Sequence, residues 1–345
     1  MRKILVIKLR YLGDVLLATS VVRLLRERRP DAVLTMAVSE GTEEVLRGNP
    51  DLDEVLVVRR GGLAAQWAFI RDVHGRRFDT VIDLTDGDRA AVLTRLSGAP
   101  VRVGFNDEHR WRGLLYTHVA QPQPGVRHRI EHDLETLRPL GIEPAMRPAV
   151  LRTSPDEDAA ADRLLRSVGI APQGGPLVAL QPGARYWFKA WPAERFAALA
   201  DRLAEAHGCR VAIGGNDGER PVGEAILRQA KSAPALLMGR TSLRHYAAVL
   251  KRCALFVGND NGPMHMAATL GVPTVGLFGP SNPAEWGPRG PYVKTLYKGL
   301  DCRRCFHPTC TRGAESCMNR ITVDEVFAAA AEMLTAKGAA TWRAR

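Results

Sequence analysis

The first residue whose type and position suit catalysis is Asp14, which ends the segment Lys8-Leu9-Arg10-Tyr11-Leu12-Gly13-Asp14. The segment follows a short apolar run and opens a helical pattern, so it lies at the carboxyl end of a predicted strand, where open α/β sheets bind ligands. A carboxylate there can accept the proton of an incoming hydroxyl group, and Gly13 lets the backbone approach a ligand closely. Aspartate is also a common helix cap, and the sequence leaves both interpretations open.

A second candidate segment, 181–192, follows another apolar run and contains Gly183, Arg185 and Lys189. Backbone N–H groups near the glycine, together with the two cations, would suit a diphosphate. The alternative is a surface turn with solvated cations and a buried Trp191.

The third segment, 258–268, has the pattern of a strand end, a tight turn and a helix start. The free N–H groups of a helix N-terminus favour an anion. Asp260 in the turn can bind sugar hydroxyls, and His265 falls on the first turn of the helix. A buried, satisfied helix residue is the alternative role for this histidine.

Two carboxylates, Asp217 and Glu219, follow the predicted strand 210–214. Carboxylates suit the paired hydroxyls of a ribose, so either residue is a candidate ligand for a nucleotide. A helix cap with a flexible entry is the alternative.

Four of the six cysteines form the pattern Cys302-x2-Cys305-x4-Cys310-x6-Cys317, with His307 inside it. In a cytosolic chain such a cluster favours a structural thiolate site for zinc over disulfides. The spacing lacks the second Cys-x2-Cys pair of many zinc sites, so reduced packing cysteines are the alternative. Because the segment follows the last predicted strand and precedes the final helix, we expect a structural role for it, and a bound zinc ion would staple a loop away from the chemistry.

Apolar runs alternate with helical patterns along the chain, which predicts parallel sheets covered by helices on both faces. We expect strands over 4–9, 33–38, 54–58, 80–84 and 101–105, then over 177–181, 210–214, 236–238, 255–257 and 274–278. We expect helices over 14–29, 63–73, 89–96, 193–206, 218–229, 243–251, 263–270 and 323–334.

The alternation stops near a proline-rich stretch at 144–155 and restarts after a loop at 171–176. A length of 345 residues suits two domains. The sequence therefore predicts an α/β chain with one domain over 1–150, a second over 172–320, and a C-terminal helix and tail over 321–345.

The net charge of +11 suits an anionic partner such as a phosphate, a nucleic acid or an anionic membrane face. A preference for arginine set by genomic base composition explains the charge equally well. No Lys/Arg run with interleaved aromatic residues occurs, so nucleic acid is not an expected partner. No apolar run approaches the ~20 residues of a membrane span. The run 4–7 is too short for a signal peptide, so we expect a cytoplasmic protein.

Together these motifs resemble glycosyltransferase family 9, the ADP-heptose:lipopolysaccharide heptosyltransferases, along almost the whole chain. The resemblance is carried by Lys8-x-Arg10-x-x-Gly13-Asp14 with Leu16-Leu17-x-Thr19, by Lys189-x-Trp191-Pro192, by Asp260-x-Gly262-x-x-His265-x-Ala267-Ala268, by 273–281, and by the cysteine segment ending Cys317-Met318-Asn319. The first motif is most similar to the branch that adds a third heptose, although Ser20 stands where that branch usually has proline.

The resemblance implies a GT-B fold, in which two Rossmann-like doubly wound domains face a central cleft and the C-terminal one binds most of the donor. It implies that Asp14 is the general base and that Lys189 binds the donor diphosphate. It assigns the donor sugar and phosphates to the loop Asp260, Asn261, Gly262 and His265, the ribose to Glu219, and a place near the adenine to Thr241.

The implied reaction is a single displacement with inversion, in which an acceptor hydroxyl attacks the donor sugar and ADP leaves. The reaction needs no metal for the chemistry. The Asp86-Gly87-Asp88 segment has the Asp-x-Asp spacing of a metal site, but it lies in the half expected to bind the acceptor. The implied partners are ADP-heptose or a similar nucleotide sugar, the lipopolysaccharide core and, peripherally, the inner face of the cytoplasmic membrane. A nucleotide-sugar epimerase and a non-catalytic binding protein are the competing hypotheses.

Overall fold

The structure is a computed structural model that describes residues 1–125, 127–302, 305 and 309–336. The chain divides into two compact units, Met1–Arg152 and Thr153–Arg345. Each unit is built around one parallel six-stranded sheet within the described residues.

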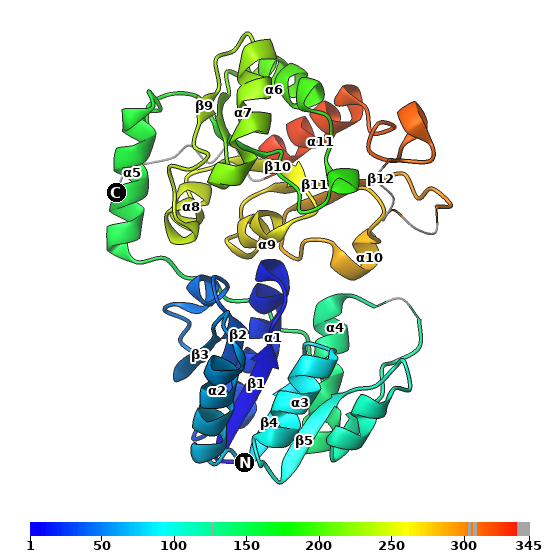
Figure 1. Cartoon of the computed structure of the whole chain (residues 1–345). Helices are drawn as coiled ribbons and strands as arrows, with labels where there is room; N and C mark the ends of the chain where they lie inside the picture. Colours follow the sequence, from blue (N-terminus) through cyan, green and yellow to red (C-terminus); the bar gives the residue numbers. More distant parts are fainter. Residues whose placement is uncertain (126, 303–304, 306–308, 337–345) are drawn as a thin grey trace. The chain divides into compact units, whose positions relative to one another are not determined.

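The first unit contains, in chain order, β1 (Lys3–Lys8), α1 (Leu12–Arg28), β2 (Val33–Ser39), β3 (Glu54–Val58), α2 (Leu63–Gly75), β4 (Thr80–Asp83), α3 (Asp88–Leu96), β5 (Val101–Phe105), β6 (His118–Ala120) and α4 (Arg129–Leu134). The strand order β3-β2-β1-β4-β5-β6 is that of a Rossmann fold. Helices α2 and α3 cover one face of the sheet, and α1 and α4 cover the other (Figure 1).

The second unit contains α5 (Pro155–Ser167), β7 (Leu177–Gln181), α6 (Ala193–His207), β8 (Arg210–Ile213), α7 (Arg220–Gln229), β9 (Ala235–Leu236), α8 (Leu243–Leu250), β10 (Leu255–Asn259), α9 (Gly262–Thr269), β11 (Thr274–Phe278), α10 (Pro283–Trp286), β12 (Val293–Tyr297) and α11 (Val323–Ala336). Its order, β12-β11-β10-β7-β8-β9, repeats that of the first unit. Helices α6, α7 and α11 pack on one face of this sheet, and α8 and α9 lie on the other (Figure 1).

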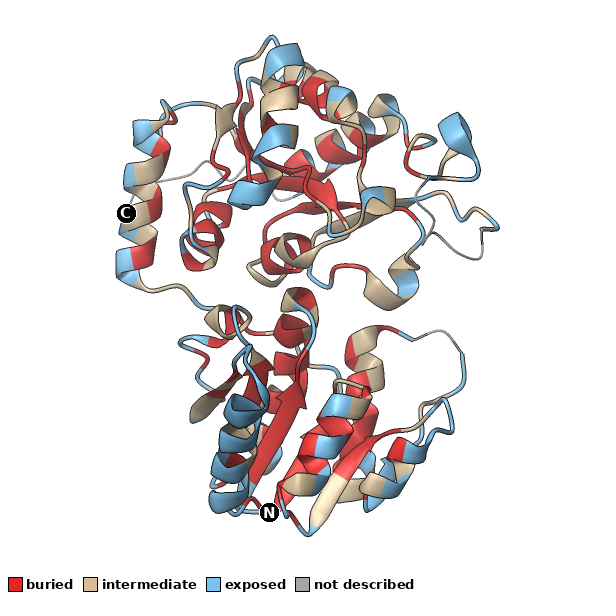
Figure 2. Ribbon diagram, in the orientation of Figure 1, coloured by how far each residue is buried: buried red, intermediate tan, exposed pale blue. Residues whose placement is uncertain are grey.

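The central strands are buried because helices cover both of their faces. In β1 the run Ile4–Ile7 has no exposed surface, and β7 and β10 are buried along their length (Figure 2). Such strands read as continuous apolar runs, the pattern expected of parallel sheets covered on both sides. The expected α/β class with two doubly wound domains is therefore confirmed.

The predicted strands recur within a few residues, but several elements were missed. The expected connection at 145–175 contains a full helix, α5, and the sheets end in two unpredicted strands, β6 and β12. Ion pairs attach α5 to α8: Arg244 pairs with Glu157 at 2.7 Å, and Lys251 and Arg252 both contact Asp158. Because few apolar residues mark α5, hydrophobic periodicity did not reveal it.

No helix in the described part of the chain is both long and apolar enough to span a bilayer.

Candidate active site

Asp14 lies at the carboxyl end of β1, as the third residue of α1. Its Oδ2 accepts a hydrogen bond from the Tyr11 backbone N–H at 3.0 Å, so the capping role is present in the structure. The carboxylate is only partly buried, and Gly13 beside it is buried. The geometry therefore combines a helix cap with an accessible carboxylate.

Three charged side chains form a buried cluster at the same end of the sheet. Lys8 is 2% exposed, and its Nζ donates to the Leu84 carbonyl at 2.7 Å and to Asp133 Oδ2 at 3.0 Å. Arg129 pairs with the other oxygen of Asp133 at 2.8 Å. Buried charges of this kind persist when they are paired and hydrogen-bonded.

The pKa shifts show how strongly these groups interact. Burial lowers the pKa of Lys8, against the opposing effect of Asp133. Burial would raise the pKa of Asp133, but Arg129 and Lys8 outweigh it and hold that pKa well below its usual range. The negative charge of Asp14 favours a higher pKa for both Lys8 and Arg129. Asp14 therefore lies close enough to interact electrostatically with the cluster.

A second buried carboxyl group, Asp83, ends the neighbouring strand β4. The Tyr116 hydroxyl donates to Asp83 Oδ2 at 2.8 Å, and the Thr85 backbone N–H donates to Oδ1 at 2.8 Å. Burial is the largest influence and raises the pKa of Asp83 to about 6. This group was not predicted, because an aspartate at a strand end is common and does not by itself indicate a site.

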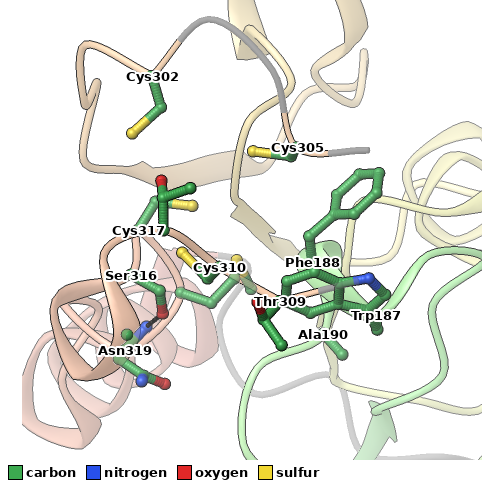
Figure 3. A pocket seen from close by; sticks show the side chains of 13 residues that line it. Trp187, Phe188, Ala190, Cys302, Cys305, Thr309, Cys310, Ser316, Cys317 and Asn319 are labelled. Carbon is green, nitrogen blue, oxygen red and sulfur yellow. Dashed lines mark hydrogen bonds between the residues drawn. The ribbon is translucent and has the colours of Figure 1, made fainter. Parts of the chain in front are cut away.

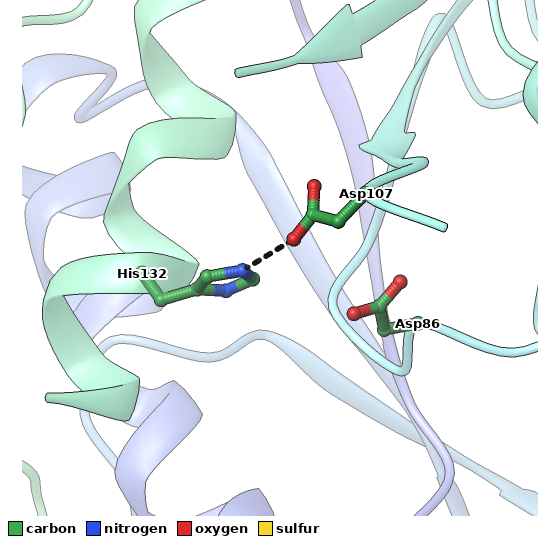
Figure 4. A group of neighbouring side chains, drawn as sticks. All are labelled: Asp86, Asp107 and His132. Carbon is green, nitrogen blue, oxygen red and sulfur yellow. Dashed lines mark hydrogen bonds and ion pairs between the residues drawn. The ribbon is translucent and has the colours of Figure 1, made fainter. Parts of the chain in front are cut away.

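Asp86, Asp107 and His132 lie together beyond β4 and β5, with their nearest donor atoms within 4.8 Å of one another (Figure 4). His132 Nε2 is 3.4 Å from Asp107 Oδ2. Asp86 also accepts a hydrogen bond from the buried Arg112 guanidinium at 3.0 Å. Since arginine already balances Asp86, the group requires no metal to be satisfied.

In the second unit, the structure brings together residues from two predicted segments at the carboxyl ends of β7 and β10, which are neighbours in the sheet. Lys189 Nζ and Asp260 Oδ2 form an ion pair at 2.6 Å. Asn261 Nδ2 donates to the Gly183 carbonyl at 2.8 Å, and its Oδ1 accepts the Met264 backbone N–H at 3.1 Å. The first of these contacts was not foreseen, because the two charges were expected to serve the ligand separately.

Asn259, at the end of β10, fixes the loop that carries Lys189. Its Oδ1 accepts the Trp191 backbone N–H at 3.1 Å, and its Nδ2 donates to the Pro182 carbonyl at 2.8 Å. The Trp191 ring is buried and donates from Nε1 to the Ile321 carbonyl at 2.9 Å. Trp191 therefore anchors the loop in the hydrophobic core of the second unit, and Lys189 lies at the edge of that core.

Glu219 follows β8 and reaches the same cluster. A side chain added at Gly183 would place its Cβ 2.0 Å from Glu219 Oε1, so the carboxylate lies directly against the backbone of the glycine. Glu219 also completes a capping box with Asn216. Burial raises the pKa of Glu219.

The remaining predicted donor residues surround this cluster less closely. Gly262 begins α9, and His265 is buried in its first turns. Thr241 is half-buried just before α8. Arg185 is exposed, and its guanidinium lies 5.5 Å from the centre of the Tyr186 ring.

The four clustered cysteines line one cavity of about 210 Å³ (Figure 3). Among the described residues no three of their sulfurs lie within 4.8 Å of one another, and the Cys302 sulfur accepts a hydrogen bond from Arg312 Nε at 2.7 Å. His307 falls outside the described residues. Burial, together with the neighbouring thiols, raises the pKa of Cys305 and Cys317.

The cysteine segment lies beside the loop that carries Lys189, not away from it. Trp187 and Phe188, which immediately precede Lys189 in the chain, form part of the same cavity wall (Figure 3). A Cβ added at Gly279 would lie 2.9 Å from the Phe188 carbonyl oxygen and 3.4 Å from the Cys317 sulfur. The cysteine segment therefore packs against the loop that carries the candidate diphosphate ligand.

Comparison with known proteins identifies the family of the chain. The family model described as glycosyltransferase family 9 (heptosyltransferase) matches residues 66–314. Lipopolysaccharide heptosyltransferase 3 of Escherichia coli is 28% identical over 293 residues, covering 81% of this chain and 84% of the relative.

Solved structures share the fold over nearly the whole chain. A family 9 glycosyltransferase from Veillonella parvula superposes with a TM-score of 0.85 at 26% identity, covering 96% of this chain and 97% of the other. An E. coli heptosyltransferase solved with ADP-2-deoxy-2-fluoro heptose has a TM-score of 0.71 at 20% identity, covering 94% and 97%. These matches confirm the resemblance seen in the motifs, and the chain belongs to glycosyltransferase family 9, the heptosyltransferase family, and is a glycosyltransferase.

Proposed function

We propose that the chain transfers a heptose from ADP-heptose to a sugar hydroxyl of the lipopolysaccharide inner core, with inversion at the anomeric carbon. The observation that carries the proposal is the gathering of Lys189, Asp260, Asn261 and Glu219 around Gly183. This set offers a cation for a diphosphate and carboxylates for sugar hydroxyls, which are the groups that a nucleotide sugar presents.

In the proposed reaction Asp14 takes the proton from the acceptor hydroxyl. The acceptor oxygen then forms a bond to the anomeric carbon of the heptose, and the bond from that carbon to the β-phosphate oxygen breaks. ADP leaves with the bonding electrons. The partly buried Asp14 carboxylate supports this role, since its cap uses only Oδ2 among the recorded bonds.

The negative charge that grows on the leaving diphosphate is stabilised by Lys189 and by the Gly262 N–H at the start of α9, since Pro263 has no N–H and the Met264 N–H is bonded to Asn261. Preorganised donors of this kind are usually the largest single contribution to catalysis. Asp260 holds the Lys189 ammonium group at 2.6 Å, and Asn259 fixes the loop behind it. Both residues thus orient the cation before the donor arrives.

Glu219 is proposed to bind the ribose hydroxyls, and Thr241 to lie near the adenine. The position of Glu219 against Gly183 supports the first role, because it brings a carboxylate to the loop that would hold the diphosphate. Family membership implies that the chemistry needs no cofactor.

Within the family we propose the branch that adds the third heptose. The support is the first motif and the similarity to heptosyltransferase 3 of Escherichia coli. We also propose that the enzyme works in the cytoplasm, at the inner face of the cytoplasmic membrane, because a lipopolysaccharide acceptor carries a lipid anchor.

We propose that Cys302, Cys305, Cys310 and Cys317 hold a structural zinc ion. The support is their shared cavity and the mutual effect on their pKa values, and binding would draw the sulfurs together from their present separation. Protein purified under reducing conditions should then contain about one equivalent of zinc, with Zn–S distances of ~2.3 Å. Absence of zinc would leave packing thiols, and a low free-thiol count in fresh lysate would indicate disulfides instead.

The proposed activity is tested by incubating the purified chain with ADP-heptose and with core oligosaccharide that lacks the branch heptose. We expect ADP release together with an acceptor product that is heavier by one heptose. Conversion of the donor without acceptor would identify an epimerase. Binding of the donor with no product from any core acceptor would identify a binding protein.

A further inference from the structure

The N-terminal half of α2 is apolar on all sides and yet exposed. The sequence from Leu63 to Ala68 contains a single polar residue, Gln66, and all six residues are exposed (Figure 2). The side chain of Leu63 is 77% exposed and that of Trp67 is 57% exposed. A helix that is hydrophobic all round is normally covered, so this segment lacks its partner in the isolated chain.

The helix is held to the sheet only by its second half. Val73 is buried, and Phe69 and Ile70 are the partly buried residues that pack against the core of the first unit. Leu63 and Trp67 are four residues apart and therefore lie on one stripe of the helix. The packing of Phe69, Ile70 and Val73 does not force Leu63 and Trp67 to be exposed.

A groove of about 530 Å³ runs beside this segment, between α2 and α3. Its walls are mostly apolar and include Ala65, Phe69 and Val92, and the exposed Trp111 closes one part of it. Apolar grooves of this size suit a flexible hydrocarbon group.

The border of this apolar region is basic. Arg59 and Arg89 line the groove, and Arg60 directly follows Arg59. Among the described residues, the one carboxylate in the lining is Asp88, which pairs with Arg110 at 3.1 Å. Arg59, Arg60 and Arg89 are all exposed, and the structure records no ion pair for their guanidinium groups within the part of the chain that it describes. Exposed Leu and Trp bordered by arginine is the composition of an element that lies in a membrane interface, because the apolar side chains enter the acyl region while the cations meet anionic headgroups.

We propose that the first half of α2, with the adjoining groove and Arg59, Arg60 and Arg89, is the surface by which this protein docks on an anionic phospholipid bilayer. The inference rests on the proposed function, since an enzyme that acts on a lipid-anchored acceptor must work at a bilayer surface. It names the protein surface involved, which the family assignment does not.

The test is co-sedimentation of the full chain with vesicles of phosphatidylglycerol and phosphatidylethanolamine, and with vesicles of phosphatidylcholine alone. We expect the wild type to bind the anionic vesicles preferentially, and the Leu63→Ser/Trp67→Ser variant to lose roughly tenfold or more of that affinity. Replacing Arg59 and Arg60 by alanine should cost roughly fivefold for each arginine. Met146→Ser, at another exposed apolar side chain of the same unit, is the matched control and should bind as the wild type does.

Equal binding of the wild type to both vesicle types, or wild-type binding by the Leu63→Ser/Trp67→Ser variant, would overturn the proposal. So would a wild-type dimer in analytical ultracentrifugation that this variant makes monomeric, because a second copy would then cover the surface. Thermal unfolding of the variant should match that of the wild type, since both side chains are exposed.

A transfer assay separates this proposal from the proposed function. The variant should still glycosylate a lipid-free core oligosaccharide, and should lose transfer only to acceptor embedded in anionic vesicles. If the wild type transfers to neither acceptor while binding anionic vesicles, the proposed function fails and the docking surface stands.

Discussion

Asp14 and Lys189 are expected to act on different substrates, so their replacement should have different effects on the nucleotide. Replacing Asp14 with Asn should lower turnover by ~10²–10⁴, the usual contribution of a general base. Affinity for ADP should remain near that of the wild type. The asparagine oxygen can still accept the Tyr11 N–H bond, so the melting temperature should change little. Near wild-type turnover of the variant would leave Asp14 as a helix cap alone.

Replacing Lys189 with Ala should weaken ADP binding as well as turnover, because its charge meets the diphosphate before and during the reaction. A charge-assisted contact contributes roughly 1.5–3 kcal/mol. Isothermal titration calorimetry with ADP gives the measurement, with Lys294→Ala as a control cation on β12. Unchanged ADP affinity in the Lys189 variant would rule out its role at the diphosphate.

The raised pKa of the buried Asp83 predicts that the free energy of unfolding depends on pH. Its folded pKa is raised to about 6 from an ordinary value of 3.8, so between these two values the folded state binds more protons than the unfolded state. The free energy of unfolding contributed by Asp83 should therefore fall as the pH rises from about 4 to about 6, by roughly 3 kcal/mol at most.

Asp83→Asn, which cannot ionise, should lack this contribution. Urea unfolding of the wild type and the variant at several pH values measures it, because the difference between the two cancels the other titrating groups. A difference that stays constant from pH 4 to pH 7 would contradict the assignment of the raised pKa.

At the scale of elements, α5 is attached by ion pairs together with the buried Ala161 and Leu165. Replacing Arg244 with Ala should leave Glu157 nearly buried without its partner and cost about 3–5 kcal/mol of stability. The exposed pair of Arg220 and Glu224 gives the matched control, since Arg220→Ala should change stability by less than about 1 kcal/mol. Equal effects of the two substitutions in urea unfolding would show that burial does not strengthen the α5 contact.

The Arg244–Glu157 pair also makes the stability of the protein depend on pH in the acid range. The Arg244 hydrogen bond is the main reason that the pKa of Glu157 falls to about 2 from an ordinary value of 4.5. Its contribution is fully present above pH 4.5 and is lost as the pH falls towards 2. The Arg244→Ala variant should therefore lose less stability than the wild type over that range.

These elements also show which parts of the fold the sequence could reveal. The strands other than β6 and β12 were predictable because they are largely apolar runs, as in β1 and β11. α5 was not, because its buried face combines only two apolar residues, Ala161 and Leu165, with ion pairs to α8, and β6 is only three residues long. Element boundaries shifted by a residue or two, as at α9, which begins at Gly262 rather than at the following proline.

The candidate site, like the fold, was predictable only in part. Lys189 and Asp260 stand in recognisable segments after strands, and the structure joins them. Asp83, Arg129 and Asp133 could not be found, because their significance lies in partners distant in sequence, such as the Lys8–Asp133 contact across 125 residues. Spacing reveals local motifs, whereas buried ion pairs depend on the tertiary structure.

At the scale of the whole molecule, the two units share one strand order, and each has candidate site residues at the carboxyl end of its first strand. The first unit places Asp14 after β1, and the second places Gly183 and Lys189 after β7. In both sheets this central strand is the point from which the chain winds in two directions, the position where doubly wound sheets bind ligands. The proposed division of labour between an acceptor base and a donor diphosphate site rests on this repetition.

The central claim is direct displacement by an acceptor oxygen activated at Asp14, and the stereochemistry of the product tests it most directly. The measurement is the anomeric configuration of the new linkage by NMR, after transfer from ADP-heptose of defined anomer by the purified chain. The account predicts the opposite configuration in the product, with one ADP released for each heptose transferred. A retained configuration, or a heptose product formed equally well by the Asp14→Asn variant, would contradict it.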